Sequence, residues 1–184
     1  MLLEVAGLQV AYGNASVLHD VAIHVDQGEM VFVVGRNGAG KTTLLKTIAG
    51  FLTPVSGTVT LAGTSVTGLP AEEVARRGTR YVFQDKRVFT RLTVRENIQL
   101  AAYAAGVPLA PAIDRVLQIH PNIARFLDTP AGGLSGGQRQ LLLIGRALVG
   151  EPRLLLIDEP TEGLAAGTIE EVFHVLQETK GKVS

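Results

Sequence analysis

The sequence predicts an α/β fold with a mainly parallel sheet, an N-terminal antiparallel β subdomain and a helical insert. Two observations carry this prediction. Strand-like and helix-like stretches alternate along the chain, and some strand candidates are continuous apolar runs of the kind found in parallel sheets. The chain has 184 residues, of which 46% are hydrophobic, so it is long enough for one domain with a sizeable core.

Six strands are expected from short apolar stretches bounded mostly by turn residues. They cover residues 2–10, 17–25, Met30 to Val34, Thr58 to Leu61, Arg80 to Phe83 and Leu154 to Ile157. Gly13-Asn14 marks the turn between the first two strands. The third run is uninterrupted and stops at Gly35, which is typical of a buried parallel strand.

Helices are predicted where apolar residues recur at helical spacing or where capping residues mark a start. They cover residues 41–49, 71–77, much of 93–126, 135–149 and 168–179. Thr93-x-x-Glu96 has the form of a capping box and opens the helical insert, which we expect over about 93–134. The order of elements therefore favours an α/β core that the insert interrupts.

Composition excludes several classes of protein. Lys+Arg and Asp+Glu are both 17, so the formal net charge is zero and no nucleic-acid partner is expected. With no cysteine, disulfides and thiolate metal sites are impossible. The N-terminus lacks the form of a secretory signal, and no stretch approaches the roughly 20 apolar residues of a membrane span. We expect any membrane association to come through a partner.

The strongest motif lies between the third strand and the first helix. Residues 35–42, Gly-Arg-Asn-Gly-Ala-Gly-Lys-Thr, fit G-x-x-x-x-G-K-[ST] without a mismatch. Glycines let backbone N–H groups and the helix N-terminus surround phosphate oxygens, and Lys41 would reach the β- and γ-phosphates. Thr42 would offer its hydroxyl to Mg²⁺. The expected nucleotide-binding residues are Gly35, Asn37, Gly38, Ala39, Gly40, Lys41, Thr42 and Thr43. The alternative is a glycine-rich turn without a ligand.

Two carboxylates, Asp158 and Glu159, follow the last predicted strand. The carboxyl ends of parallel strands face the ligand crevice, so Asp158 could hold Mg²⁺ through its water shell. Glu159 could act as general base on the attacking water. The alternative is an ordinary acidic turn at the end of a strand.

The helix expected from residue 135 begins with a second glycine-rich motif. Ser135 and Gln138 have capping-box spacing, but the intervening Gly136 and Gly137 weaken a helix and are not explained by capping. Bare backbone at a helix N-terminus suits close approach by an anion. Because the phosphate loop already encloses one nucleotide, we expect this turn to face a nucleotide bound to a second copy.

The phosphate loop, the string Leu-Ser-Gly-Gly-Gln at 134–138 and the run Leu-Leu-Leu-Ile-Asp-Glu-Pro at 154–160 occur in this order. Together they resemble the nucleotide-binding subunit of ABC transporters, over essentially the whole chain. The resemblance implies a P-loop NTPase core, ATP and Mg²⁺ as ligands, and a homo- or heterodimer that encloses two ATP molecules. It also implies a permease partner at the cytoplasmic face of the inner membrane.

The same resemblance implies further site residues. Tyr12 would stack on adenine, and Gln84 would contact Mg²⁺ and act with Glu159 as a catalytic residue. Thr42, Gln84 and Asp158 would form the metal site. The residues expected to meet the partner's ATP are Ser135, Gly136, Gly137 and Gln138.

Within the family, the string Glu-Pro-Thr-Glu-Gly-Leu-Ala at 159–165 resembles the ATPases of branched-chain amino acid importers. Urea and short-chain amide importers have similar ATPases, so the solute stays open. Ala166 departs from the subgroup, which usually has proline there. A soluble ABC protein that acts on DNA or the ribosome is a weaker alternative, because the long coiled coil or second cassette of such proteins is not seen.

The family also has a histidine after the next strand, and His19, His24, His120 and His174 do not match it. His174 is expected on the surface of the last helix. Gly181 is expected to end that helix and residues 182–184 to begin a strand, so the sequence suggests a C-terminally truncated domain of reduced stability. A nucleotide-binding module without turnover is therefore the third hypothesis.

Overall fold

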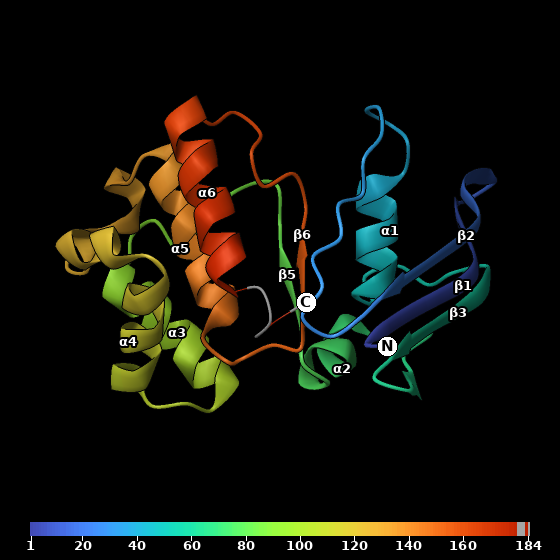
Figure 1. The fold of residues 1–184 in the computed structure, drawn as a ribbon, viewed down its shortest axis with the longest axis horizontal. Helices are drawn as coiled ribbons and strands as arrows, with labels where there is room; N and C mark the ends of the chain where they lie inside the picture. Colours follow the sequence, from blue (N-terminus) through green and yellow to red (C-terminus); the bar gives the residue numbers. More distant parts are fainter. Residues whose placement is uncertain (180–182, 184) are drawn as a thin grey trace. The chain divides into compact units, whose positions relative to one another are not determined.

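The computed structural model describes residues 1–179 and 183 (Figure 1). It divides into two units, each described here by itself. The first holds residues 1–81 and 153–158, and the second holds residues 82–152 and 159–179. The helix end expected at Gly181 lies outside the described residues, as does the strand start expected at 182–184 apart from Val183. The predicted α/β fold class is confirmed.

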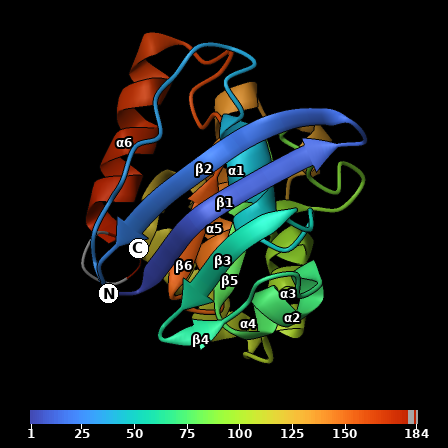
Figure 2. The ribbon, with the colours of Figure 1, turned by 90° about the vertical axis from the view of Figure 1, so that its right-hand side faces the viewer.

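The first unit is built on a four-stranded antiparallel sheet with strand order β2-β1-β3-β4 (Figure 2). Its strands are β1 (Leu3–Tyr12), β2 (Ala15–Val25), β3 (Ser56–Leu61) and β4 (Thr64–Ser65). β1 alternates buried and exposed positions, as expected for a sheet with one face on a core. The hairpin predicted at Gly13-Asn14 is confirmed, because β1 pairs with β2 directly across that turn.

Helix α1 (Lys41–Ile48) packs against this sheet. Its buried Leu44 and Ile48 belong to the same apolar cluster as Leu8 of β1 and Val59 of β3. The helix ends as predicted before Gly50, which has a φ of 80°. The sheet therefore holds in place α1, the helix that follows the phosphate loop.

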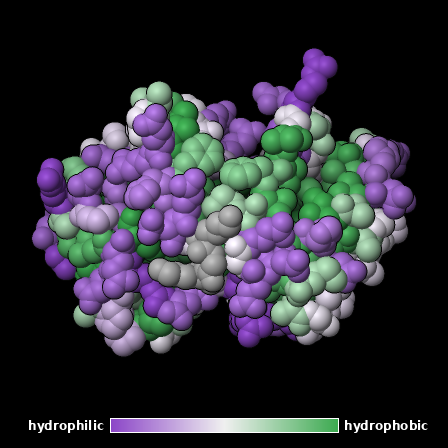
Figure 3. All heavy atoms as spheres, viewed as in Figure 1, coloured by the Kyte–Doolittle hydropathy of each residue, from purple (hydrophilic) through white to green (hydrophobic). Residues whose placement is uncertain are grey.

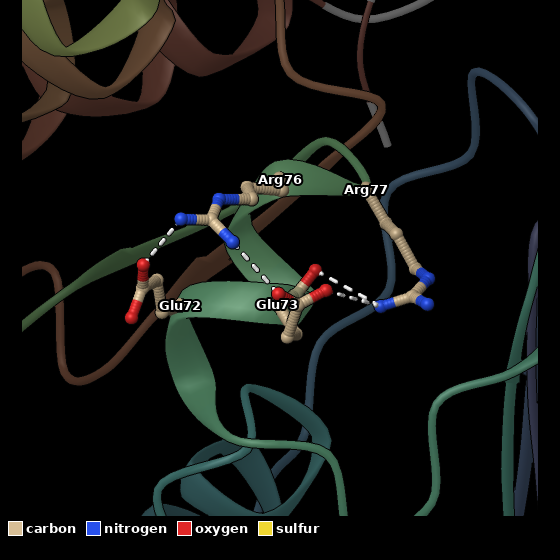
Figure 4. A network of polar contacts seen from close by, with 4 residues as sticks. All are labelled: Glu72, Glu73, Arg76 and Arg77. Atoms are coloured by element: carbon tan, nitrogen blue, oxygen red, sulfur yellow. Dashed lines mark hydrogen bonds and ion pairs between the residues drawn. The ribbon is translucent and has the colours of Figure 1, made fainter.

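The short helix α2 (Ala71–Arg76) carries a surface network of ion pairs (Figure 4). Arg76 contacts Glu72 and lies 2.7 Å from Glu73, and Arg77 lies 3.4 Å from Glu73. Exposed pairs of this spacing are worth about 0.3–0.5 kcal/mol each. They support a helix of six residues that is too short to be stable by itself.

A second, parallel sheet pairs β5 (Thr79–Val82) with β6 (Leu154–Ile157). β5 starts one residue before its predicted position, and β6 has its predicted bounds. Leu154 and Leu156 are buried, with exposed fractions of 3% and 6%. The continuous apolar run that predicted β6 therefore forms a strand whose alternate residues join the core.

The buried strand predicted at Met30 to Val34 is wrong. These residues form no strand, and four of their side chains are exposed: Val31 at 42%, Phe32 at 60%, Val33 at 38% and Val34 at 88%. The physical reason is that no described strand pairs with this run, and a strand exists only as part of a hydrogen-bonded ladder between two segments. Apolar surface is visible around this segment and α1 in Figure 3.

The second unit is helical. Its elements are α3 (Val94–Ala105), α4 (Leu109–Ile119), η1 (Pro121–Phe126), η2 (Ala131–Gly133), α5 (Gly136–Leu148) and α6 (Ala166–Thr179). Val94, Ile98, Val116 and Leu142 lie in its core with at most 1% exposure. No single helix among residues 1–179 is long and apolar enough to cross a membrane; α3 and α4 pass that test only as a pair bent by 116°.

The start of the helical region is held by a buried amide. Asn97 is fully buried and accepts a hydrogen bond from the Phe89 N–H at 3.0 Å, while its Nδ2 donates to the carbonyl of Phe89 at 3.0 Å and to that of Thr93 at 2.9 Å. The Arg146 guanidinium of α5 lies over the Phe89 ring, 5.1 Å from its centroid. These contacts fix the segment that follows Gln84 against the helices of the same unit.

Candidate functional site

The phosphate loop connects the Met30–Val34 segment to α1, and two of its positions require glycine for steric reasons. Gly38 and Gly40 have φ values of 82° and 90°, in the left-handed region that other residues avoid. A Cβ on Gly40 would also lie 2.7 Å from Cδ2 of Leu18. Asn37 and Ala39 are exposed together with Gly38, so the backbone of the loop is accessible.

The N-terminus of α1 has no side-chain cap. A helix leaves its first N–H groups without partners inside the helix, and here Gly40 at the cap position cannot supply one. Thr43 lies in this first turn with its side chain buried at 7% exposure, so its backbone N–H is the group it can offer. The local electrostatics favour an anion at this end of α1.

Lys41 folds back over the loop. Its ammonium donates to the carbonyl of Gly35 at 3.0 Å and to the carbonyl of Arg36 at 3.2 Å. The Ala39 N–H closes the turn on the Arg36 carbonyl at 3.1 Å. The loop thus places the Lys41 ammonium, an exposed backbone and a helix N-terminus within seven consecutive residues, 35–41.

Two residues predicted to hold the metal meet in the first unit. The Thr42 hydroxyl donates to Oδ1 of Asp158 at 3.0 Å, and the Tyr81 hydroxyl donates to Oδ2 at 3.0 Å. Asp158 is only 3% exposed, so these bonds fix its carboxylate. Burial, and then the negative charge of Asp158, raise the pKa of Tyr81, so that its hydroxyl remains a donor. Hydroxyl and carboxylate oxygens suit Mg²⁺, so these residues fit the expected ion.

Gln84 and Glu159 are brought together in the second unit. Nε2 of Gln84 donates to Oε2 of Glu159 at 3.0 Å and to Oε2 of Glu162 at 2.7 Å. Sequence analysis assigned no role to Glu162. The one signal for it was its position three residues after Glu159, the predicted general base, which is the spacing of a turn. The other expected metal residue, Gln84, is thus held by two carboxylates.

The turn that opens α5 forms the predicted capping box. The Ser135 N–H donates to Oε1 of Gln138 at 2.8 Å, and the Gln138 N–H donates to Oγ of Ser135 at 3.2 Å. The two glycines between them differ. A Cβ on Gly137 would lie 2.3 Å from Cγ2 of Thr168 in α6, whereas a Cβ on Gly136 would meet no atom within 4 Å.

This difference corrects part of the sequence argument. Packing against α6 explains Gly137 without a ligand, because any larger side chain would collide with Thr168. Only Gly136 is left without a packing reason, so the case for an anion at this turn rests on its exposed face.

The remaining predicted positions lie as follows. Tyr12, at the end of β1, is 50% exposed. His174 is exposed on α6, as predicted. His120 is 5% exposed at the end of α4, with Nδ1 3.3 Å from Oε1 of Glu171. Burial lowers the pKa of His120, and the charge of Glu171 opposes that shift.

Comparison with known proteins identifies the family. Residues 18–162 match the family described as ABC transporter. The chain belongs to this family. It is an ATP-binding cassette of the ABC type, and the cassettes of this family are ATPases.

Several curated ABC relatives cover most of the chain. It is 39% identical over 170 residues to the high-affinity branched-chain amino acid transport ATP-binding protein BraG of Pseudomonas aeruginosa, covering 92% of this chain and 73% of BraG. It is 38% identical over 173 residues to the probable branched-chain amino acid transport ATP-binding protein LivF of Archaeoglobus fulgidus, covering 94% and 73%. The maltose/maltodextrin import ATP-binding protein MalK of Yersinia pestis is 40% identical over 158 residues, covering 85% of this ABC chain and 42% of MalK.

Solved structures agree with the ABC assignment. A nucleotide-free ATP-binding cassette from an ABC transporter superposes with a TM-score of 0.88 at 28% identity, over 99% of this chain and 78% of that one. A dimeric bacterial ABC transporter cassette superposes with a TM-score of 0.83 at 27% identity, over 99% and 85%.

Proposed function

We propose that this ABC cassette binds and hydrolyses ATP to power the import of a small solute, with branched-chain amino acids as the substrate class. The observation that carries the ATP site is the Thr42–Asp158 hydrogen bond of 3.0 Å. It ties the first turn of α1 to the carboxylate after β6, 116 residues further along the chain. The bond thereby brings a hydroxyl oxygen and a carboxylate oxygen, both of the kind that Mg²⁺ prefers, to one point beside the loop.

Binding would use the phosphate loop as follows. The backbone N–H groups of residues 35–40 and the uncapped start of α1 would surround the β- and γ-phosphates. Lys41 would exchange its two carbonyl partners for phosphate oxygens, which are stronger acceptors because they are charged. Thr42 and Asp158 would hold Mg²⁺, which supplies neutralisation of the phosphate charge when it is bound. Tyr12 would stack on adenine.

Hydrolysis would use the pair Gln84 and Glu159. The Glu159 carboxylate would take a proton from the attacking water as general base. Gln84 would orient that base through the hydrogen bond of 3.0 Å from its side-chain amide to Glu159. Its side-chain carbonyl oxygen would bind the metal. Both side chains belong to the second unit, whereas the phosphate loop belongs to the first.

A second copy would complete the reaction. In each chain Ser135, Gly136, Gly137 and Gln138 would meet the γ-phosphate of ATP bound to the other chain, so that a homo- or heterodimer encloses two nucleotides. The exposed face of Gly136 and the helix dipole of α5 suit that contact. Dimeric association of a related cassette supports this arrangement.

We further propose that residues 1–184 belong to a single nucleotide-binding domain with a helical insert at about 93–134. It would dock on a membrane permease and lie peripherally at the cytoplasmic face of the membrane. The relatives named as transport or import proteins support these partners.

The proposed solute rests on BraG and LivF. MalK, at similar identity, is named for maltose/maltodextrin import, which is a different class of solute, and the ATPases of urea and short-chain amide importers remain the alternative. Uptake of labelled leucine tests this choice, in bacterial cells that lack the ATP-binding subunits of their own branched-chain amino acid importer and receive this chain with its permease. Restored leucine uptake that is lost in Glu159→Gln is expected. Restored urea uptake without leucine uptake would transfer the chain to the amide class.

Turnover of Mg-ATP by the purified chain tests the catalytic part. We expect the rate to rise faster than linearly with protein concentration, because each site needs residues from two chains, and to fall about 10²- to 10⁴-fold in Glu159→Gln. Glu178→Gln, an exposed change on α6, is the matched control. ATP binding without turnover would instead identify a catalytically impaired nucleotide-binding module.

A further inference from the structure

We propose that Glu162 is a positioning residue, which holds the Gln84 amide so that its carbonyl oxygen is the end available to the nucleotide-bound metal. This inference rests on the proposed role of Gln84 as a metal ligand. It goes further in assigning a function to a carboxylate that neither binds the metal nor activates water.

The amide chemistry fixes the orientation. A glutamine amide has two N–H donors on Nε2 and one acceptor, Oε1, while an ionised carboxylate only accepts. Nε2 of Gln84 has one carboxylate at 2.7 Å, from Glu162, and a second at 3.0 Å, from Glu159. Turning the amide over would place Oε1 against both negative oxygens. The two carboxylates therefore commit both N–H groups and leave Oε1 for a cation.

Glu162 is itself held at this position. Its N–H donates to the carbonyl of Glu159 at 3.3 Å, which closes the turn at 159–162. The Lys86 ammonium contacts the carbonyl of Glu162, so the segment at 84–86 is attached to this turn at two points besides the Glu159 contact. Lys86 and Glu159 both have positive φ values, 49° and 48°. Such backbone persists only where surrounding contacts hold it.

Loss of Glu162 has a defined consequence for Gln84. One of its two N–H groups would lose its acceptor, and the shorter of the two bonds would disappear. Glu159 alone would still hold the amide, but with more rotational freedom and with its own carboxylate engaged by a less ordered partner. We expect the Mg²⁺ concentration for half-maximal effect to rise about 3- to 10-fold, with a smaller change in the affinity for free ATP.

The first test needs neither nucleotide nor metal. The side-chain amide signal of Gln84 is measured by ¹⁵N NMR in the full chain and identified by its loss in Gln84→Leu. Glu162→Ala should shift it towards the position of a solvated glutamine and speed its hydrogen exchange. Glu162→Gln should give an intermediate result, since its Oε1 still accepts, and Glu178→Gln should give none. An unchanged Gln84 signal in Glu162→Ala would overturn the proposal.

The second test measures the role in the metal site. Mg²⁺ is titrated against nucleotide binding, followed with a fluorescent non-hydrolysable ATP analogue, in the wild type and the same variants. A merely structural role for Glu162 would lower thermal stability but leave the Mg²⁺ dependence unchanged, and that result would overturn the proposal. A wild-type chain that fails to bind any nucleotide would refute the proposed function instead, while the NMR result would still show whether Glu162 orients Gln84.

Discussion

The phosphate loop and the turn at 134–138 look alike in sequence, since each is a glycine-rich segment that opens a helix, but the structure completes only one of them. Ser135 and Gln138 exchange two hydrogen bonds and close the start of α5. The start of α1 has no side-chain cap, and Lys41 bonds only carbonyls of its own loop. The turn is capped by its own side chains, whereas the loop is exposed and leads into an uncapped helix N-terminus that favours an anion.

The largest effect should come from the incomplete segment. Lys41→Ala removes the ammonium from the loop, and we expect the affinity for Mg-ATP to fall about 100-fold, because charge-assisted bonds to two phosphates are lost. Isothermal titration measures this change. Lys46→Ala, on the last turn of the same helix, is the control and should bind normally. Equal ATP affinity in wild type and Lys41→Ala would show that the loop is not the nucleotide site.

The two glycines of the closed turn should respond in opposite ways. Gly137→Ala places a Cβ 2.3 Å from Cγ2 of Thr168, and overpacking of this kind should lower the free energy of unfolding by about 1–3 kcal/mol. Gly136→Ala meets no atom and should leave that free energy unchanged or raise it by about 0.5–1 kcal/mol. It should nevertheless reduce ATP turnover, by blocking the approach of the second nucleotide.

Urea unfolding of both variants gives the free energies, and turnover is read on the same samples. A comparable loss of stability in Gly136→Ala would mean that this glycine is also needed for packing. That result would contradict the inference that only Gly137 is required for packing.

The capping role of the Ser135 hydroxyl can be distinguished from its proposed ligand role by comparison with the cap of a second helix. α3 begins with the same kind of capping box, formed by Thr93 and Glu96. Ser135→Ala and Thr93→Ala should each cost about 1 kcal/mol of stability. ATP turnover should fall by about tenfold or more in Ser135→Ala alone, because only that hydroxyl would also meet a phosphate. Equal turnover in both variants would reduce Ser135 to a helix cap.

A smaller effect, on thermal stability at high pH, is expected from Tyr81, which bonds the Asp158 carboxylate beside the phosphate loop. Folding raises the pKa of Tyr81 above its ordinary value of 10.0, through burial and the charge of Asp158. The unfolded chain therefore loses this proton first, so the associated stability is complete below about pH 10 and declines as the pH rises towards the folded-state pKa. Tm measured from pH 8 to 11 should fall less steeply in Tyr81→Phe than in the wild type. Parallel curves would remove Tyr81 as a source of that decline.

Local structure could be predicted from the sequence because neighbouring residues determine it. The capping boxes at Thr93 and Ser135 and the hairpin turn at Gly13 are all formed by side chains or backbone within a few positions. The conserved geometry of a helix start needs no information from the rest of the chain. The same holds for the uncapped phosphate loop, whose glycines predict their own left-handed backbone.

Two apolar runs show where this kind of prediction ends. Met30–Val34 and Leu154–Ile157 give the same signal for a buried parallel strand, yet only the second pairs with a described neighbour. Strand pairing is a property of two distant segments, so periodicity cannot reveal whether the partner is there. The contacts of Gly137 and Glu162 could not be predicted for the same reason. Thr168, which packs against Gly137, lies 31 residues away along the chain, and Gln84, which bonds Glu162, lies 78 residues away.

A mixing experiment with two inactive variants tests the central claim most directly. Lys41→Ala spoils the phosphate loop and Ser135→Arg obstructs the turn, so neither chain alone can form an intact site. If the turn of one chain serves the loop of the other, an equal mixture contains heterodimers with one intact site, and ATP turnover should recover to about a quarter of the wild-type rate. Turnover no higher than the sum of the separate variants, in a mixture shown to form heterodimers, would contradict a shared site.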